Sequence, residues 1–277
     1  MLRHPISRAT ALAPLLVIAA LAPHAAGAQL RLSGGVEAGY APSLVWRGIT
    51  RSERAVFTPA VFARADAGAN VVTAGVWSAW EFREAPQATL SLRPPRSAGV
   101  GEIDLWAQYT RHVLRTDLSA GVVRYLFPER EGEDATEAYL QLWPDSTGLP
   151  VDLRGALHVG LEEENPVYAE VEASHSFSLA PLPGGPPSLL LGATGGFSLH
   201  APANARPAAF DDEGATHLLL AATLLVPADR LTVHISARHQ RSFDGATRRV
   251  APGETSDHRT WGELGVAYVV GPQRKAK

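Results

Sequence analysis

Most of this chain alternates apolar residues with small, polar or aromatic residues at every second position. The stretch 102–109, for example, reads Glu-Ile-Asp-Leu-Trp-Ala-Gln-Tyr. Successive side chains of a β-strand point to opposite sides, so this alternation predicts strands with one apolar face and one mixed face. After residue 29 there is no convincing helical period and no apolar run of about 18 residues, which a membrane-spanning helix would need. The sequence therefore predicts an all-β chain.

About twelve such segments follow one another, and most are about 9 to 13 residues long. That length suits a tilted strand that crosses a bilayer better than the five or six residues typical of soluble sheets. The expected strands are 30–42, 55–65, 71–82, 102–112, 118–127, 136–144, 151–161, 167–179, 188–199, 216–226, 231–242 and 260–270. We therefore expect a single transmembrane, antiparallel, up-and-down β-barrel.

The connections between these segments tend to alternate in length. Longer links rich in Pro, Gly, Arg and Asp cover 43–54, 83–101, 200–215 and 243–259. An even-stranded barrel with both termini in the periplasm has this bias, because its outer loops are longer than its periplasmic turns. A soluble β-sandwich also gives alternating strands. Its outer face is uniformly polar, whereas the mixed face here includes Gly, Trp and Tyr and suits a lumen better.

The N-terminus resembles a processing signal. Arg3 and Arg8 precede an apolar run over 12–22, which is too short to span a bilayer as a helix, and Ala26-Gly27-Ala28 forms a cleavage site. An uncleaved anchor is the alternative, and the short run between two prolines disfavours it. The expected organisation is a signal peptide over 1–28 and an outer-membrane barrel over 29–277, in a Gram-negative bacterium.

The composition limits the chemistry. The chain has no cysteine, and its 25 lysines and arginines are slightly outnumbered by 28 aspartates and glutamates. Disulfides, Cys-ligated zinc and iron–sulfur clusters are therefore excluded, and a nucleic-acid partner is not expected. We find no nucleophile elbow, no zinc-protease motif and no phosphate-binding loop, and the histidines lack metal-ligand spacing. We expect no cofactor, no metal site and no enzymatic activity.

One grouping resembles a hydrolase site. His158 lies on the strand before Glu170 and Glu172, and Ser174 or Ser176 follow on that second strand. Neighbouring strands could bring serine, histidine and acid together. Serine and histidine are also ordinary lumen residues, so an outer-membrane barrel enzyme of the lipid-hydrolase type stays an alternative. A closed structural or adhesive barrel is a further one.

The mixed face carries the charges that would line a pore. Nine acids and five arginines share this face by parity, which predicts a weak preference for cations. Arg154 is expected to pair with Glu170 or Glu172, and Arg47 either narrows the pore or pairs with a carboxylate. The expected pore-lining residues are Glu37, Arg47, Glu102, Asp104, Arg124, Glu137, Asp152, Arg154, Glu170, Glu172, Arg238 and Glu263.

Aromatic residues near the strand ends suggest interfacial girdles. Ordinary packing at strand ends is the alternative explanation. The residues in question are Trp46, Trp80, Phe82, Phe127, Trp143 and Trp261.

Several motifs over roughly 35–145 resemble, in order, those of the TorF-like porins, an outer-membrane family of Gram-negative bacteria. In that family the first strand runs into an aromatic-Arg-Gly turn, which Val45-Trp46-Arg47-Gly48-Ile49-Thr50 matches here. The further matches are Pro59-Ala60-Val61, Ala74-Gly75-Val76-Trp77, Glu102-Ile103-Asp104-Leu105, Arg124-Tyr125-Leu126-Phe127-Pro128 and Glu137-Ala138-Tyr139-Leu140. The resemblance implies an outer-membrane barrel with a pore role. The chain departs from the usual aromatic C-terminus of such barrels, since Tyr268 is its last aromatic residue.

These expectations also indicate which molecules the protein contacts. A passive outer-membrane channel contacts membrane lipid and lipopolysaccharide, requires the barrel-assembly machinery for insertion and conducts small hydrophilic solutes. The sequence leaves open whether the chain is a monomer or a homo-oligomer.

Overall fold

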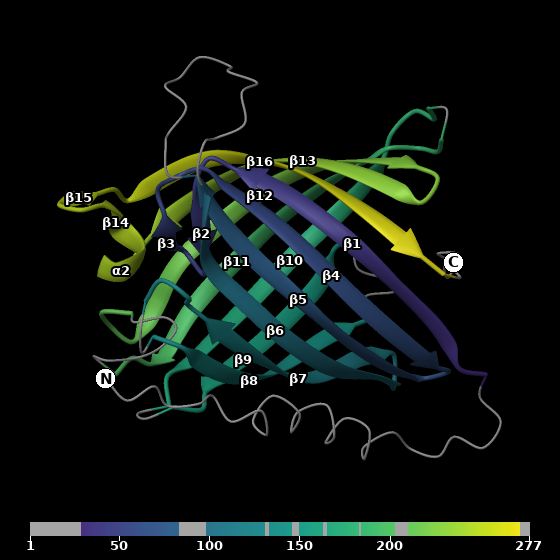
Figure 1. Ribbon diagram of the computed structural model, residues 1–277, viewed down its shortest axis with the longest axis horizontal. Coiled ribbons are helices and arrows are strands. Elements are labelled where there is room, and N and C mark those ends of the chain that lie inside the picture. The colour runs from purple at the N-terminus through teal and green to yellow at the C-terminus, as the bar shows by residue number, and fades with distance from the viewer. Residues whose placement is uncertain are drawn as a thin grey trace.

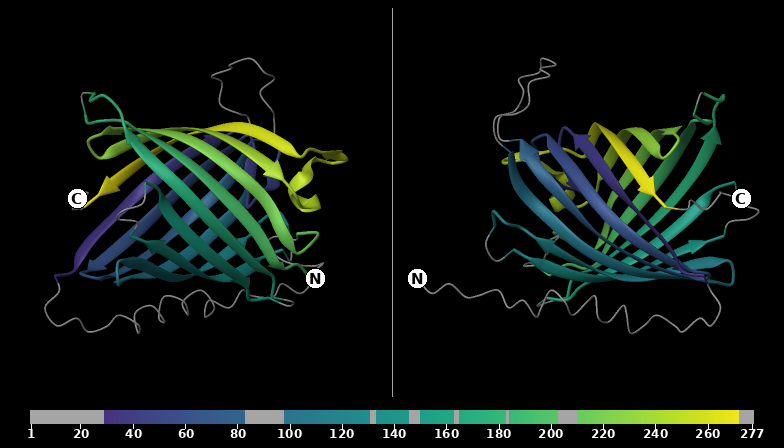
Figure 2. Two further views of the ribbon diagram at one scale, coloured as in Figure 1. Left: turned by 180° about the vertical axis from the view of Figure 1, so that it is seen from behind. Right: turned by 45° about the vertical axis from the view of Figure 1, so that its right-hand side comes forward.

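Twelve long antiparallel strands close into one barrel in the computed structural model of this chain (Figures 1 and 2). Residues 29–82, 98–130, 133–145, 150–162, 165–182, 184–202 and 210–271 are described by the structure. Strands that follow one another in the wall are hydrogen-bonded, and the sheet closes between β1 (Arg31–Ala41) and β16 (His258–Val270). The expected signal peptide lies outside the described residues. Within them, no helix is long and apolar enough to cross a membrane.

The expected strands are confirmed, with ends that differ by a few residues. The other barrel strands are β4 (Val56–Ala67), β5 (Asn70–Phe82), β6 (Ala98–Val113), β7 (Thr116–Leu126), β8 (Ala135–Pro144), β9 (Asp152–Gly160), β10 (Val167–Ser178), β11 (Ser188–His200), β12 (Gly214–Ala228) and β13 (Leu231–Ser242). The short elements are β2 (Leu44–Trp46), β3 (Ile49–Ser52), α2 (Gly245–Arg248), β14 (Arg249–Ala251) and β15 (Glu254–Thr255). All of these short elements lie in links between strands at one end of the barrel, which we call the loop end (Figure 1). The opposite end is the turn end.

The outer face of the barrel is apolar all the way round. Each barrel strand presents at least one large, exposed aliphatic side chain on this face: Val36, Val61, Val76, Leu105, Leu118, Leu140, Leu157, Val171, Leu191, Leu220, Ile235 and Leu264. Several of them are direct cross-strand neighbours, as Val36, Val61 and Val76 are on β1, β4 and β5. A soluble monomer rarely exposes so large an apolar surface, whereas a barrel surrounded by hydrocarbon requires it.

Aromatic residues on the outer face lie near both ends of the barrel. Tyr40, Phe57 and Trp80 are exposed neighbours at the loop end of β1, β4 and β5. Phe177 and Tyr268 are exposed near the turn end of their strands. Two such belts are typical of membrane barrels.

The aromatic residues that suggested girdles in the sequence are mostly on the other face. Trp80 does lie outside, but the prediction is wrong for four of the six. Trp46 and Phe127 pack into one buried cluster, Trp143 lies against the lumen residue Arg154, and Trp261 lines the lumen. A position near a strand end does not define a face; the parity of the residue within the strand does.

The inner face pairs bulky residues with glycine. Gly121 on β7 is the cross-strand partner of Tyr139 on β8, and the Tyr139 ring lies over it. The Tyr139 hydroxyl donates a hydrogen bond of 3.1 Å to Gln108 Oε1. The absence of a side chain at Gly121 therefore gives the Tyr139 ring its place against the wall.

Replacing Gly121 by valine should destabilise the barrel. A Cβ at this position would overlap the Tyr139 ring and lie 2.8 Å from the Ala107 carbonyl oxygen. We expect a loss of about 1 to 3 kcal/mol in the free energy of unfolding, measured by urea titration in detergent. Gly155→Val is the control, because a Cβ at Gly155 meets nothing within 4 Å. Equal stability of the two variants would contradict the assigned packing.

Candidate functional site

A short hairpin, β2–β3, folds into the barrel instead of extending its wall. β1 ends at Ala41, so Arg47 does not lie on a prolonged first strand. Trp46 packs against a buried cluster that includes Tyr125 and Phe127, and also against Tyr168. The hairpin therefore lies within the lumen.

The turn of the hairpin depends on Arg47 and Gly48. Both residues have positive φ, 48° and 79°, which is the conformation of a two-residue hairpin turn. A Cβ at Gly48 would lie 2.7 Å from His217 Nδ1, so glycine is required both by the backbone and by the space. Arginine seldom adopts positive φ, and its anchoring in the lumen offsets that cost.

Arg47 is anchored by a buried, bidentate ion pair with Glu137 on β8. The two guanidinium nitrogens donate to the two carboxylate oxygens at 2.7 Å each. The side chains are only 6% and 4% exposed. Tyr125 donates a further hydrogen bond of 2.9 Å to Glu137 Oε2. The guanidinium carbon lies 4.1 Å from the ring centre of Trp46 and 4.7 Å from that of Tyr168, so two aromatic rings flank the cation.

The charge of Arg47 is stable in this setting. Burial by itself lowers the pKa of the guanidinium, because it disfavours the charged form. The carboxylate of Glu137, through its charge and its hydrogen bonds, and the neighbouring Tyr125 and Tyr168 oppose burial and together outweigh it, so the net pKa lies above the ordinary value. Arg47 is therefore a permanent cation in the lumen.

The other side of the hairpin is held by β13 and β16. Gln240, which is 2% exposed, donates a 2.8 Å hydrogen bond to the Gly48 carbonyl oxygen. Arg259 on β16 donates to the Thr50 hydroxyl. Four strands of the wall separate β8 from β13 on one side and six on the other. The hairpin therefore bridges the lumen nearly from wall to wall.

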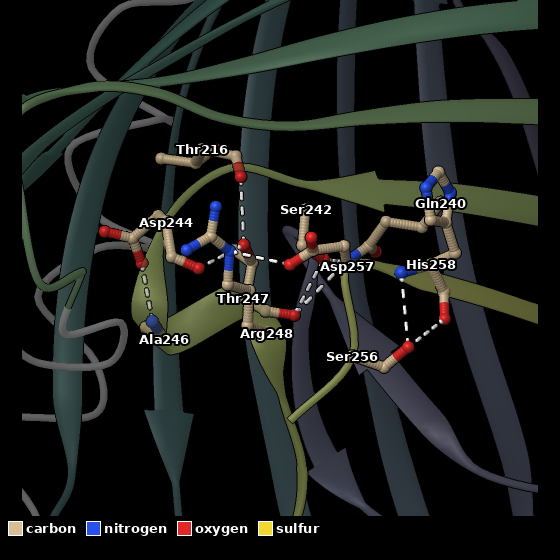
Figure 3. Close-up of polar contacts among 10 residues, drawn as sticks. All are labelled: Thr216, Gln240, Ser242, Asp244, Ala246, Thr247, Arg248, Ser256, Asp257 and His258. Atoms are coloured by element: carbon tan, nitrogen blue, oxygen red, sulfur yellow. Dashed lines mark hydrogen bonds and ion pairs between the residues drawn. The ribbon is translucent and has the colours of Figure 1, made fainter. Parts of the chain in front are cut away.

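A hydrogen-bonded segment around α2 supports this bridge (Figure 3). Asp244 caps α2 by accepting from the Ala246 amide at 2.8 Å. The Thr247 hydroxyl donates to the Thr216 carbonyl at 2.9 Å, and Ser242 donates to the Thr247 carbonyl at 2.9 Å. α2 also contacts β3. The link between β13 and β16 is thus fixed against the hairpin.

Next to the hairpin the lumen holds a chamber of about 460 Å³. Hairpin residues 45–48 form one side of it, and inward-facing residues of the wall form the rest. Those wall residues are Asp104, Trp106, Val123, Tyr125, Tyr139, Arg154, His158, Glu170, Glu172, Thr194, His217, Leu219, Arg238, Gln240 and Trp261. The chamber combines carboxylates, arginines and aromatic rings, so it can take up polar and charged solutes.

The structure places nearly all of the charges that the sequence assigned to the lumen on the inner face. On the barrel wall these are Glu37, Glu102, Asp104, Glu137, Asp152, Arg154, Glu170, Glu172, Arg238 and Glu263. Arg47 joins them from the hairpin. Arg154 contacts both Glu170, at 3.1 Å, and Glu172, at 3.3 Å, which confirms the expected pairing. Arg238 pairs with Glu263 at 2.9 Å.

Arg124 is a correction, because it lies on the outer face. Its cross-strand partners are Leu105, which is 40% exposed on that face, and Thr136. The next residue, Tyr125, points inward to Glu137. Arg124 donates to the Thr136 hydroxyl at 2.8 Å and lies close to Asp134, near the loop end, where these partners balance its charge.

The hydrolase-like grouping is not assembled. His158 is the cross-strand partner of Tyr168, whereas Ser174 pairs with Asp152, six positions further along β10. Six strand residues correspond to about 20 Å, too far for a hydrogen bond between serine and histidine. Among the described residues, no group of three or more His, Asp or Glu side chains could hold a metal ion.

Several contacts of the hairpin were missed by sequence reasoning. Tyr168, His217, Gln240 and Phe210 receive it, and they come from three strands and a loop. For Tyr168, His217 and Gln240 the available signal was their place among the inward-facing residues of their strands, whereas Phe210 lies in a loop and gave none. Nothing in the sequence indicated that a loop would come back to meet them.

Three solved structures illustrate what this chain is similar to. They are OmpF of Salmonella typhi in a complex with daunomycin (TM-score 0.38, 8% identity, 88% of this chain and 98% of that chain), the translocator domain of the autotransporter NalP from Neisseria meningitidis (0.37, 12%, 94% and 94%) and an anion-selective porin from Comamonas acidovorans (0.37, 8%, 87% and 99%). No protein-family profile matches the chain, and a search of curated proteins gave no match. The chain is a closed, antiparallel β-barrel that resembles porins and an autotransporter barrel, and no family is assigned to it.

Replacing Glu137 by glutamine should destabilise the protein strongly. The substitution leaves the Arg47 cation buried without its carboxylate, which costs about 3 kcal/mol or more in the free energy of unfolding. Urea unfolding in detergent measures this loss. Glu172→Gln is the matched control: Glu172 is 30% exposed and Arg154 keeps Glu170, so we expect less than about 1 kcal/mol. Similar losses for both variants would refute the anchoring role of Glu137.

Proposed function

We propose that this chain is an outer-membrane barrel of a Gram-negative bacterium that acts as a narrow, passive channel for small hydrophilic solutes. The observation that carries the proposal is the contrast between the two faces of one closed sheet. The outer face is apolar on every strand, and the inner face bears paired charges around a chamber. The motif resemblance to TorF-like porins supports the same function. The hairpin is the constriction of the proposed channel.

The proposal also implies which molecules contact the protein. Membrane lipid and lipopolysaccharide would contact the apolar outer face, and the barrel-assembly machinery would insert it. No cofactor, nucleic acid or catalytic step is part of the proposed function.

A closed structural barrel is the second candidate. The specific observation that favours it is the hairpin itself, because Glu137 and Gln240 hold its two sides and the bridge crosses the lumen. The two candidates differ in one measurable property, the ionic conductance of the purified protein in a planar bilayer. Discrete conductance steps of the intact chain would support the channel.

Replacing the hairpin should widen the channel. We expect a variant in which residues 44–52 are exchanged for a short Gly-Ser linker to conduct several times more current per step than the intact chain, because the bridge across the lumen is gone. The control exchanges Leu114 and Arg115, the turn between β6 and β7 at the opposite end of the barrel, for Gly-Ser. It should conduct like the intact chain. An unchanged conductance after hairpin exchange would contradict the constriction.

The channel should prefer cations weakly. Acids outnumber arginines on the inner face, and a confined bore with low-dielectric walls concentrates counter-ions. The reversal potential across a KCl gradient should therefore indicate a modest excess of K⁺ permeation. The preference should fade as salt rises, since the screening length is about 10 Å at 0.1 M and shorter above it. Anion preference at low salt would refute the prediction.

A further inference from the structure

The residues that bind Arg47 belong mainly to the barrel wall and form a binding site. Its parts come from consecutive strands of the wall: Tyr125 from β7, Glu137 from β8, His158 from β9 and Tyr168 from β10. Tyr125 donates to Glu137, and Phe210 stacks on Tyr168 at 5.5 Å with nearly parallel rings. Both of these contacts join residues outside the hairpin, although Trp46 of the hairpin also packs against Tyr125 and Tyr168. We call this set of wall residues the Glu137 cage.

The geometry of the cage fits a guanidinium group. Both carboxylate oxygens of Glu137 accept at 2.7 Å from two different nitrogens, which only a planar, forked cation can supply. The Tyr168 ring lies 4.7 Å from the guanidinium carbon, a distance suited to cation–π contact. A compact ammonium ion has no planar fork, so it cannot give each oxygen a parallel donor of its own and also present a flat face to the ring. The cage therefore discriminates by shape as well as by charge.

The cage borders the chamber of the lumen. Tyr125, His158 and Arg47 itself line that 460 Å³ space. A solute in the chamber is therefore adjacent to the group that now occupies the cage. Glu170 and Glu172 line the same space and are paired with Arg154, so the chamber accepts polar groups of either sign and the selection for a cation comes from the cage itself.

We propose that the Glu137 cage is a binding site for the guanidinium group of a small solute, and that Arg47 occupies it as an internal ligand. A guanidinium-bearing solute and Arg47 compete for the same two oxygens. Solute binding releases one side of the hairpin and so opens the constriction. The gating consequence deepens the proposed channel function and rests on it, whereas the binding itself does not.

The concentration of solute that displaces Arg47 can be estimated. Arg47 is tethered, and a short tether gives an effective concentration in the millimolar range. The contacts of Gln240 and Arg259 on the other side of the hairpin raise it further. A free solute therefore displaces Arg47 only at millimolar concentration or above. Removing the Arg47 side chain removes the competitor and uncovers the site.

The binding test uses the full-length Arg47→Ala protein in detergent, with folding checked by circular dichroism. Methylguanidinium chloride is titrated by calorimetry, and methylammonium chloride, which has the same charge but no fork, is the comparison. We expect at least tenfold tighter binding of methylguanidinium. Adding Glu137→Gln should abolish that binding, while adding Glu172→Gln in the same background should preserve it. Folded Arg47→Ala protein that binds neither ion, or both equally, overturns the inference.

Two further measurements keep the test decisive. If Arg47→Ala does not fold, the same titration is made on Arg47→Lys, which keeps the charge of the hairpin but loses the fork, and the same tenfold difference is expected. In planar bilayers, 100 mM methylguanidinium should raise the conductance of the intact chain relative to 100 mM methylammonium. An equal conductance in the two salts overturns the gating. A complete lack of conductance in every variant refutes the channel function instead, and the calorimetric result still decides the binding site.

Discussion

Closure of the sheet between β1 and β16 is the constraint on which the rest of the structure depends. The register runs from Gly34 opposite Val270 to Tyr40 opposite Leu264, so the first and last strands satisfy each other's backbone groups. A sheet with open edges could not stand in hydrocarbon, where unpaired backbone groups have no water to bind. Closure also separates an apolar outside from a polar inside, because alternate residues of every strand must take opposite faces.

The number of strands leaves space in the lumen, and the hairpin fills part of it. A barrel of eight strands is filled by its own side chains, whereas wider barrels leave space in the lumen. Here twelve strands enclose a lumen that β2–β3 partly fills at the loop end. The Arg-Gly turn directs a cation at Glu137, and Gln240 receives the backbone of the same turn on the far side. The lumen is thus narrowed by a loop, and the strands of the wall supply the residues that hold it.

The sequence was sufficient to predict the barrel but not the site. Strict alternation in stretches such as 102–109 fixes both the strand and its faces, so the wall could be predicted strand by strand. Where two apolar residues follow each other, as at Val122 and Val123, the parity is ambiguous, and Arg124 was assigned to the wrong face. The hairpin was out of reach for a different reason: its partners on β8, β10 and β13 are distant in sequence, and no local pattern encodes contacts of such separation.

The contact that holds the hairpin is an ion pair, and an ion pair differs from an apolar contact in what it costs to separate the partners. A well-packed apolar pair often stabilises a buried contact as well as an ion pair does, because ions lose their hydration on burial. Stability alone therefore does not explain why Arg47 and Glu137 hold the hairpin. A guanidinium and a carboxylate regain hydration when they part, whereas the contacts of Trp46 and Ile49 with the apolar clusters are lost whenever the hairpin withdraws. The ion pair therefore adds little to the cost of the opening proposed above, while its forked geometry fixes a single closed position.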